Sequence, residues 1–450
     1  MGILFGTDGI RGVANMPPMT PEMALNIGKA AACYFKEKCG EKRSKIVIGK
    51  DTRLSGYMLE NALNAGIVSA GVDVLPVGIL PTPAIAHLTK SLNADAGIVL
   101  SASHNPAEDN GIKIFNGEGF KLSDEVEEEI EEYILRKRIE TSHIKGDSIG
   151  KAHYVDEVKG RYIEFAKASV RNMSLRGIKI VLDCANGAAY NTAPYMFGEL
   201  GAEVIVLNDK PDGMNINFEC GALHPEKMME VVKSEKADVG IALDGDADRV
   251  IVCDENGRNV DGDHIIAICA LYLKENALLE KNSVVTTIMT NKGFDIAMRK
   301  KGITVIKSNV GDKYVIDEMK KTGCVLGGEQ SGHIIFSQYT TTGDGIVSAL
   351  QLLRVMKEKG ETLSSLASCM KALPQIIVNV GVKEKRDVNV LNAKKQIEEA
   401  EKALGNMGRV LVRYSGTQNL CRVMIEGEDK NEIKKLANTI AAAIKEEIGI

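Results

Sequence analysis

The sequence predicts an α/β protein whose C-terminal part is a smaller α+β region. Short apolar, β-branched runs alternate with longer helical patterns through most of the chain, which is typical of α/β units. Many of these runs end in a Gly- or Asp-rich loop. A chain of 450 residues is also long enough for about three or four domains.

Six apolar runs are the clearest strand candidates: residues 45–49, 97–100, 178–182, 204–207, 239–243 and 284–288. Helical stretches separate them, so we expect largely parallel strand pairing. In open α/β sheets, ligands bind beyond the carboxyl ends of the strands. The loops that follow these runs are therefore the places to look for a functional site.

Residues 123–138 predict an amphipathic helix. Ser123 can cap its N-terminus, where the acidic residues that follow suit the positive end of the helix dipole, and the basic residues 136–138 suit the C-terminus. The helix carries six glutamates, and we interpret them as a solvated face rather than a binding surface: Glu125, Glu127, Glu128, Glu129, Glu131 and Glu132.

Three stretches are candidate domain boundaries: residues 145–151, the turn at residues 254–259, and Leu373-Pro374. After Pro374 the pattern changes to a strand, a helix, a hairpin and a second helix, predicted at residues 376–382, 388–404, 409–425 and 431–447. This order indicates a small α+β domain.

Composition excludes two classes of partner. The formal net charge is −5, and aromatic residues are 11 Tyr and 9 Phe with no Trp, which disfavours a nucleic-acid-binding surface. No apolar stretch approaches the roughly 18–20 residues that span a bilayer. The N-terminus also lacks a basic region and a cleavage site, so we expect neither membrane insertion nor secretion.

The cysteines indicate a reducing compartment. They are odd in number, scattered and without a C-x-x-C pair, at positions 33, 39, 184, 220, 253, 269, 324, 369 and 421. We therefore expect reduced thiols and a cytoplasmic protein. Cys220 and His224 have no second ligand pair beside them, so we do not predict a zinc site there.

The first loop with candidate chemistry, Ser101-Ala102-Ser103-His104-Asn105-Pro106, follows the apolar run 96–100. It exposes a hydroxyl beside an imidazole, which suits an activated nucleophile. Serine beside histidine is also common turn composition. The loop lacks the G-x-S-x-G pattern of hydrolases, so acyl transfer is disfavoured.

The second loop, Asp244-Gly245-Asp246-Ala247-Asp248-Arg249, follows the run 239–243. Its three carboxylates repel one another at neutral pH, and a divalent cation with oxygen ligands would neutralise them. An EF-hand is the alternative, because Glu255 stands at the twelfth position. Arg249 stands where that loop needs glycine, however, and residues 250–253 read as a strand. The sequence therefore predicts a metal site at the three aspartates.

Two further loops carry weaker signals. Arg413-Tyr414-Ser415-Gly416-Thr417 combines an arginine, hydroxyls and a glycine that permits a backbone nest, which suits a phosphate but is also hairpin composition. Gly327-Gly328-Glu329-Gln330-Ser331-Gly332-His333 combines a carboxylate, a hydroxyl and an imidazole, which suits sugar hydroxyls. Walker, Rossmann and H-E-x-x-H motifs are absent.

Together and in this order, the loops resemble those of the α-D-phosphohexomutase superfamily over essentially the whole chain. Three more segments share the resemblance: Phe5-Gly6-Thr7-Asp8-Gly9-Ile10-Arg11-Gly12, Gly49-Lys50-Asp51-Thr52-Arg53-Leu54-Ser55-Gly56 and Asp183-Cys184-Ala185-Asn186-Gly187-Ala188. Other features are similar to the glucosamine branch of the superfamily: Asn309-Val310-Gly311-Asp312-Lys313-Tyr314-Val315, Gln330 and Thr341-Thr342-Gly343-Asp344-Gly345. The sequence departs from the family at Gln418-Asn419, where Glu-Pro is usual, and at Ala107, where an aromatic residue is common.

The resemblance implies an isomerase that interconverts glucosamine 6-phosphate and glucosamine 1-phosphate and so feeds UDP-GlcNAc synthesis in amino-sugar metabolism. It makes Ser103 the phosphorylated nucleophile. It also places Mg²⁺ between the serine phosphate and Asp244, Asp246 and Asp248. A phosphoserine carries about −1.5 to −2 charges, so a cation is needed beside three aspartates. Glucosamine 1,6-bisphosphate is then the intermediate and activator.

The resemblance also implies roles for other side chains. A clamp for the phosphate that is not reacting would consist of Arg413, Ser415, Gly416 and Thr417. Glu329 and Ser331 would read the sugar hydroxyls, and Arg249 would neutralise phosphate. The candidates for orientation and proton transfer are Arg11, Lys113, His104 and His333, and the choice of general acid or base stays open.

The fold that the resemblance implies has three similar α/β domains and a smaller α+β domain around a central cleft. The phosphoserine, metal, sugar and phosphate loops would lie in residues 1–152, 153–254, 255–370 and 374–450, respectively. The expected partner is a phosphosugar, without nucleic acid or membrane, and a homodimer is left open. Two alternatives remain: a phosphomannomutase/phosphoglucomutase, and an inactive phosphosugar-binding or regulatory protein that binds without phosphorylation of Ser103.

Overall fold

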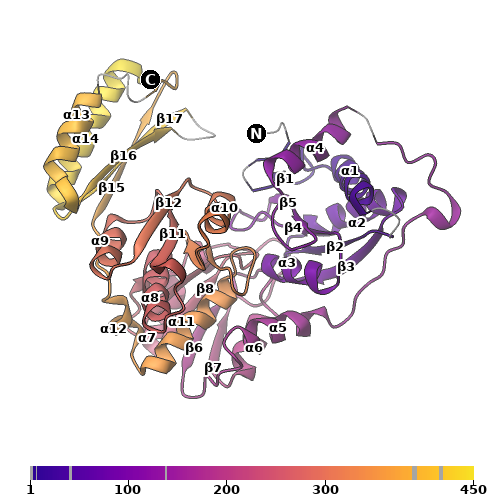
Figure 1. Cartoon of the computed structure of the whole chain (residues 1–450), viewed down its shortest axis with the longest axis horizontal. Coiled ribbons are helices and arrows are strands. Elements are labelled where there is room, and N and C mark those ends of the chain that lie inside the picture. Colours follow the sequence, from indigo (N-terminus) through magenta and orange to yellow (C-terminus); the bar gives the residue numbers. More distant parts are fainter. Residues whose placement is uncertain (1–3, 7, 40–42, 137–138, 388–392, 415–418) are drawn as a thin grey trace. The chain divides into compact units, whose positions relative to one another are not determined.

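The computed structural model describes residues 4–6, 8–39, 43–136, 139–387, 393–414 and 419–450 (Figure 1). The chain forms two compact units. The larger unit contains residues 1–289 and 306–368, and the C-terminal unit contains residues 290–305 and 369–450. Two segments of the chain therefore belong to the C-terminal unit, a short internal one and the C-terminal one.

The first sheet of the larger unit consists of β1 (Ile10–Val13), β2 (Lys45–Lys50), β3 (Asp73–Ile79), β4 (Ala96–Leu100) and β5 (Asp109–Asn116). Its strand order is β1-β5-β4-β2-β3. β2 pairs in parallel with β3 and β4, whereas β5 is antiparallel to both β4 and β1. The first candidate loop thus joins a parallel strand to an antiparallel one.

Helices cover both faces of this sheet. They are α1 (Pro21–Cys39), α2 (Ser55–Ser69), α3 (Thr82–Ser91) and α4 (Asp124–Leu135). Ile46 and Ile48 of β2 share one buried core with apolar residues of α1, α2 and α4. α3 packs on the opposite face, where a Cβ added at Gly49 would collide with the side chain of Ile85. Alternation along β2 therefore produces an α/β/α sandwich.

The second sheet consists of β6 (Lys179–Asp183), β7 (Glu203–Leu207), β8 (Val239–Leu243), β9 (Val250–Asp254) and β10 (Asn259–Val260), in the order β10-β9-β8-β6-β7. Its accompanying helices are α5 (Val158–Ala168), α6 (Ala193–Glu199) and α7 (Glu226–Glu235). The third sheet consists of β11 (Ser283–Thr287), β12 (Thr304–Ser308), β13 (Leu326–Gly328) and β14 (Ile334–Phe336), in the order β12-β11-β13-β14. The remaining helices of the larger unit are α8 (Gly262–Glu275), α10 (Asp312–Thr322), α11 (Gly345–Lys359) and α12 (Leu363–Ala367).

The three sheets repeat one topology. When the edge strands β1 and β10 are left aside, the orders β3-β2-β4-β5, β7-β6-β8-β9 and β12-β11-β13-β14 all read second, first, third and fourth strand along the chain. In each sheet, the connection from the third strand to the fourth is one of the loops singled out in the sequence. The Ser103, Asp244 and Glu329 loops therefore occupy one equivalent position in three similar α/β layers.

The C-terminal unit has a three-stranded antiparallel sheet of β15 (Gln375–Gly381), β16 (Arg409–Tyr414) and β17 (Leu420–Glu426), in the order β15-β17-β16. Its helices are α9 (Lys292–Lys300), α13 (Lys394–Leu404) and α14 (Lys430–Ile448). Val380, Val423 and Ile425 of the sheet share a buried core with Ile433 and Ile440 of α14. This unit has the predicted α+β composition.

The six predicted strands all form, with ends that differ by one residue at most. The expectation of largely parallel pairing is wrong in part, because β5, β9 and β14 are antiparallel to the strands that precede them. The loops before these strands are too short for the crossover that parallel pairing requires. In the C-terminal unit, the predicted helix at 388–404 begins only at Lys394, and residues 388–392 lie outside the described residues.

The prediction for residues 123–138 needs three corrections. The helix α4 ends at Leu135, and the side chain of Ser123 at its N-cap makes no capping hydrogen bond. Glu131 is buried, and its Oε1 accepts a hydrogen bond from the backbone N–H of Leu4 at 2.8 Å. The solvated-face interpretation is therefore wrong for Glu131. Residues 137–138 lie outside the described residues.

Three other sequence features can be located. The turn at residues 254–259 joins β9 to β10, the edge strand of the second sheet. Within the described ranges, no helix combines the length and apolarity needed to cross a membrane. No disulfide joins the cysteines that the structure describes.

Asp344 provides a pH-sensitive contact in this fold. It caps α11 by accepting hydrogen bonds from the N–H groups of Ile346 and Val347, and the buried Tyr162 hydroxyl donates to its carboxylate at 2.9–3.0 Å. Burial raises the pKa of Asp344 from 3.8 to about 6.

Replacing Asp344 with asparagine is expected to change how stability depends on pH. The folded protein holds the Asp344 proton more tightly than the unfolded chain, so ionisation destabilises the wild type as pH rises from about 4 to 7, by about 3 kcal/mol. An asparagine side chain does not ionise, so the free energy of unfolding of Asp344→Asn should rise relative to wild type over this range. Urea unfolding at several pH values measures the difference, with Asp156→Asn as an exposed control. Parallel profiles for wild type and Asp344→Asn would contradict the assignment.

Candidate active site

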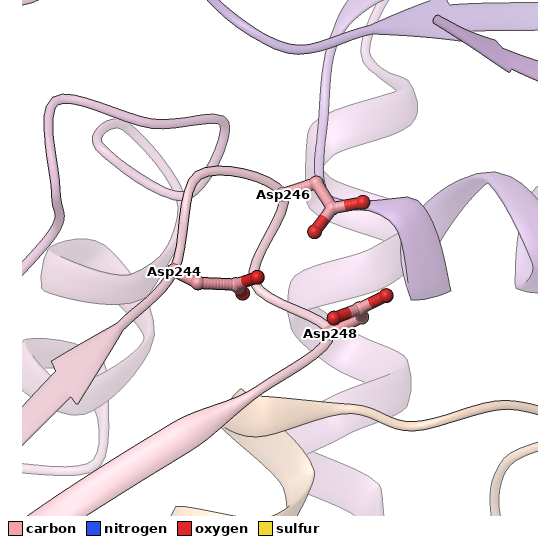
Figure 2. Close-up of side chains that lie close together, drawn as sticks. All are labelled: Asp244, Asp246 and Asp248. Atoms are coloured by element: carbon pink, nitrogen blue, oxygen red, sulfur yellow. The ribbon is translucent and has the colours of Figure 1, made fainter. Parts of the chain in front are cut away.

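Three aspartates converge at the end of β8. Asp244, Asp246 and Asp248 come from the single loop between β8 and β9, and their carboxylates turn toward a common space (Figure 2). Each residue is at most 2% exposed. One oxygen from each carboxylate lies within 4.8 Å of the other two. Three converging carboxylates could hold a metal ion.

The donor set fits a divalent cation. Oδ1 of Asp246 and Oδ1 of Asp248 are buried and have no hydrogen-bond partner among the described residues. Buried carboxylate oxygens without a hydrogen-bond partner are costly, and a cation with oxygen ligands would remove that cost. The other oxygen of Asp246 accepts a hydrogen bond from Thr82 Oγ1 at 2.6 Å, which fixes the orientation of the carboxylate.

Lys113 on β5 supplies positive charge to the triad. Its Nζ lies 2.9 Å from Asp246 Oδ2, 3.2 Å from Asp248 Oδ2 and 3.5 Å from Asp8 Oδ2. Burial works against the ammonium, but the three carboxylates outweigh it and raise the pKa of Lys113 well above its usual value. By contrast, burial together with Asp248 and Asp246 raises the pKa of Asp244 well above its usual range. The three aspartates therefore differ in charge compensation, with Asp244 the least compensated.

Ser103 faces this triad. Its Oγ donates a hydrogen bond to Asp244 Oδ2 at 2.6 Å and lies 3.3 Å from His104 Nδ1. The residue is 1% exposed, and its φ of 51° is left-handed, a region that serine seldom occupies. The loop after β4 thus brings the predicted nucleophile against the predicted metal ligands, although residues 103 and 244 are far apart in sequence.

A cavity of about 400 Å³ opens beside these residues. Its lining includes Asp8, Arg11, His104, Arg249, Glu329 and His333. Burial, reinforced by Arg249 and Arg11, lowers the pKa of His104 to about 4, so the imidazole is neutral near pH 7. Arg11 donates to Asp8 and, at 3.4 Å, to the Ala102 carbonyl. The wall of the cavity therefore combines fixed positive charge with a neutral imidazole.

His333 and Arg249 lie next to Asp248. His333 Nδ1 is 3.6 Å from Asp248 Oδ1, and Arg249 Nε is 3.8 Å from the same oxygen. The backbone N–H of Gly343 donates to His333 Nε2 at 3.0 Å. In the neutral imidazole the proton is therefore on Nδ1, facing Asp248.

The loop between β13 and β14 divides into an inner and an outer part. Glu329 is 8% exposed, lines the cavity, and accepts a hydrogen bond from the Gly311 N–H at 3.1 Å. Ser331 is exposed and is not among the residues that line the cavity. Gln330 donates to Asp261 Oδ2 at 3.0 Å, on the loop that starts α8. The structure brings Glu329 to the site but not Ser331, and Gln330 acts as an anchor for the loop.

In the C-terminal unit, the predicted phosphate clamp has a partner that sequence reasoning missed. Arg413 on β16 lies directly opposite Arg422 on β17. Burial and Arg422 lower the pKa of Arg413, and Arg422 Nε is buried without a hydrogen-bond partner in the described part of the chain. Like charges in cross-strand register destabilise a hairpin, and a bound anion would offset that repulsion. The other clamp residues, Ser415, Gly416 and Thr417, lie outside the described residues.

Comparisons with known proteins match this architecture. Models of the phosphoglucomutase/phosphomannomutase α/β/α domains I, II and III match residues 2–140, 152–257 and 261–373, and the C-terminal domain model matches residues 377–443. The phosphoglucosamine mutase of Pelobacter propionicus is 57% identical over 448 residues, which cover 99% of each chain. The chain belongs to the phosphoglucosamine mutase family.

Solved structures confirm the fold that the family implies. A phosphoglucomutase/phosphomannomutase family protein from Burkholderia thailandensis has a TM-score of 0.82 at 24% identity, with 99% of each chain covered. The N-acetylphosphoglucosamine mutase of Aspergillus fumigatus, solved with GlcNAc-6P and magnesium, has a TM-score of 0.68 at 18% identity, covering 99% of this chain and 96% of that chain. The predicted fold of three α/β domains and a C-terminal domain is confirmed.

Four residues around this phosphoglucosamine mutase-family site were not among the predicted site residues. Asp8 and Asp312 both pair with Lys121, and Thr82 binds Asp246. Asp8 and Asp312 lie in segments that carried the family resemblance, which was the available signal for them. Lys121 and Thr82 lie outside those segments. Their contacts join residues that are distant in sequence, so the sequence alone does not indicate their roles.

Proposed function

We propose that this chain acts as a phosphoglucosamine mutase, an isomerase that interconverts glucosamine 6-phosphate and glucosamine 1-phosphate. In this proposal Ser103 carries a phosphoryl group, and glucosamine 1,6-bisphosphate is the intermediate and activator. The observation that carries it is the 2.6 Å approach of Ser103 Oγ to one carboxylate of a triad that could hold a metal. Full-length relatives of this name support the choice of substrate. The product would feed UDP-GlcNAc synthesis.

The two half-reactions balance without a further co-reactant. In the first, the bond between Ser103 Oγ and phosphorus breaks, and a bond forms between a sugar hydroxyl oxygen and phosphorus. The sugar hydroxyl loses a proton, and Ser103 Oγ gains one. In the second, the other phosphate of the bisphosphate returns to Ser103 by the reverse transfer. Each cycle therefore moves phosphate from one sugar oxygen to the other and regenerates the phosphoserine.

Side chains around the cavity suit these transfers. Lys113, Arg11 and Arg249 supply positive charge for the phosphoryl group, while His104 and His333 are the imidazoles available for proton exchange. Asp244, Asp246 and Asp248 would hold Mg²⁺ together with the serine phosphate. The ion would withdraw charge from the phosphoryl group as its bond to Ser103 breaks.

Substrate binding is assigned to the remaining loops. Glu329 reads sugar hydroxyls from the wall of the cavity. Arg413, with Ser415, Gly416 and Thr417, binds a substrate phosphate, and we add Arg422 to this group. We assign Ser331 only a supporting role, since its side chain is exposed. The division into residues 1–152, 153–254, 255–370 and 374–450 gives each domain one loop. A cytoplasmic location and a homodimer stay predictions.

The proposed function is tested by a direct assay. Phosphorylated protein is incubated with Mg²⁺ and glucosamine 6-phosphate, and formation of glucosamine 1-phosphate is measured beside glucose and mannose phosphates. The proposal predicts the highest kcat/KM for the glucosamine substrate. Equal or greater efficiency with a hexose phosphate would favour a phosphomannomutase/phosphoglucomutase. Binding without turnover would favour an inactive phosphosugar-binding protein.

Replacing Arg422 with glutamine is expected to weaken phosphate binding without weakening the fold. Loss of one charge-assisted hydrogen bond, worth about 1.5–3 kcal/mol, should raise KM for glucosamine 6-phosphate by about 10–100-fold. The unliganded melting temperature should stay the same or rise, because the repulsion with Arg413 is removed. Steady-state kinetics and thermal unfolding measure both effects. Arg386→Gln, at an exposed arginine of the same unit, is the matched control, and equal KM values for the two variants would contradict the assignment.

A further inference from the structure

The backbone of Ser103 has a left-handed conformation that serine rarely adopts. A left-handed φ of 51° is unfavourable for a non-glycine residue. Such a conformation persists only when surrounding contacts fix it. In this case both backbone polar groups of Ser103 are fixed: Ser101 Oγ accepts from its N–H at 2.9 Å, and two side chains donate to its carbonyl oxygen.

The first donor is Arg53, which is 0% exposed. Its Nη2 donates to the carbonyls of Ser103 and Asn105 at 3.0 and 2.8 Å, and its Nη1 donates to those of Pro106 and Asp109. Its Nε donates to Asp51 at 2.9 Å. All five N–H donors of the guanidinium are therefore used, four of them on backbone carbonyls of residues 103–109.

Ser101 and Asn217 belong to the same hydrogen-bond network as Arg53. Asp51 also accepts from Ser101 Oγ at 2.6 Å, so the group that fixes the Ser103 N–H is tied to the same ion pair. From the second sheet's domain, Asn217 Nδ2 donates to the carbonyls of Ser103 and Asn105 at 2.9 and 3.0 Å.

The metal loop also lies against this carbonyl. A Cβ added at Gly245 would lie 2.6 Å from the Ser103 carbonyl oxygen. The loop that contains Ser103 and the loop that contains the three aspartates are therefore in close contact at the Ser103 carbonyl.

We propose that Arg53 and Asn217 are positioning residues for phosphoryl transfer, an inference that rests on the proposed function. Neither lines the cavity. Together they hold the Ser103 carbonyl from two domains, and this keeps Oγ directed at the aspartate triad. Phosphoryl transfer depends on alignment of the donor and acceptor oxygens, so a small displacement of Oγ slows the chemical step without changing substrate binding.

The test uses Asn217→Gly in the full-length protein. Glycine accepts the left-handed φ of 59° at this position, and the substitution removes the side chain that carries the amide donor. We expect kcat for glucosamine 6-phosphate to fall by about 10–100-fold, with KM unchanged within about two-fold. The matched control is Asn208→Gly, at another left-handed asparagine of the same domain, whose side chain binds Asp183 instead. It should keep the wild-type kcat.

A second variant and a wild-type measurement keep the inference testable if Asn217→Gly folds poorly. Ser101→Ala removes the acceptor for the Ser103 N–H and should lower kcat in the same way at unchanged KM. In the unmodified protein, hydrogen exchange at the Ser103 amide should be slow, because the N–H is bonded and buried.

The outcomes separate the two proposals. A wild type that neither carries phosphate nor converts glucosamine phosphates would overturn the proposed function. An active wild type in which either folded variant keeps its kcat, or changes only KM, would overturn the positioning roles. Exchange of the Ser103 amide at the rate of an exposed loop would overturn them as well.

Discussion

Replacing Ser103 with alanine is expected to lower kcat for glucosamine 6-phosphate by at least about 10³-fold. Without Oγ, no group can donate the first phosphoryl group to the sugar or accept the second one from the bisphosphate, and positioning of the substrate alone cannot replace these transfers. Binding should persist, because the cavity wall and the arginine pair are unchanged. Steady-state kinetics measure the loss, and calorimetric titration with glucosamine 6-phosphate measures the retained affinity.

Ser103→Gly is the matched variant for this experiment. The left-handed φ of 51° is strained for alanine and free for glycine, so a purely conformational effect would be reversed in the glycine variant. We expect both variants to be equally inactive. Substantial mutase activity in either would contradict the phosphoserine mechanism.

Replacing Asp246 with asparagine is expected to weaken the metal response and the rate together. The substitution removes one negative charge from the triad, and it leaves Lys113 beside the remaining carboxylates. Loss of one charged ligand should raise the Mg²⁺ concentration for half-maximal activity by about 10–100-fold and lower kcat at saturating Mg²⁺. Activity measured as a function of free Mg²⁺ gives both quantities.

Asp254→Asn serves as the control for the metal experiment. Asp254 is also a buried carboxylate, at the far end of β9, but it accepts hydrogen bonds from the backbone of its own turn. Its substitution should leave the Mg²⁺ dependence unchanged. If Asp246→Asn also leaves the half-saturating Mg²⁺ concentration unchanged, the triad is not the metal site.

Much of this site could be predicted because its chemistry is concentrated in short segments. The three aspartates stand within five residues after an apolar run, and mutual repulsion of neighbouring carboxylates indicates a cation without knowledge of the fold. The strands could also be predicted from short segments, because buried β-strands appear in the sequence as continuous apolar runs.

The features that escaped prediction depend on packing between distant segments. Arg422 has no special context in sequence, and its position opposite Arg413 follows from the hairpin register. Glu131 belongs to an acidic run, yet helix rotation places it against the backbone of Leu4. Ser331 and Glu329 are two residues apart, but the turn exposes one and buries the other. The order of residues in the sequence does not by itself show where these side chains lie in the folded protein.

The most direct test of the central claim is mass analysis of the phosphorylated protein. Wild-type protein treated with isotopically labelled glucosamine 1,6-bisphosphate and Mg²⁺ should gain one labelled phosphoryl group, located by peptide mapping at Ser103. After the bisphosphate is removed, addition of unlabelled glucosamine 6-phosphate should move the label from Ser103 to the sugar phosphate, while an unlabelled phosphoryl group takes its place on the serine. Absence of phosphate, phosphate on another residue, or label that stays on Ser103 in the presence of glucosamine 6-phosphate would contradict the account.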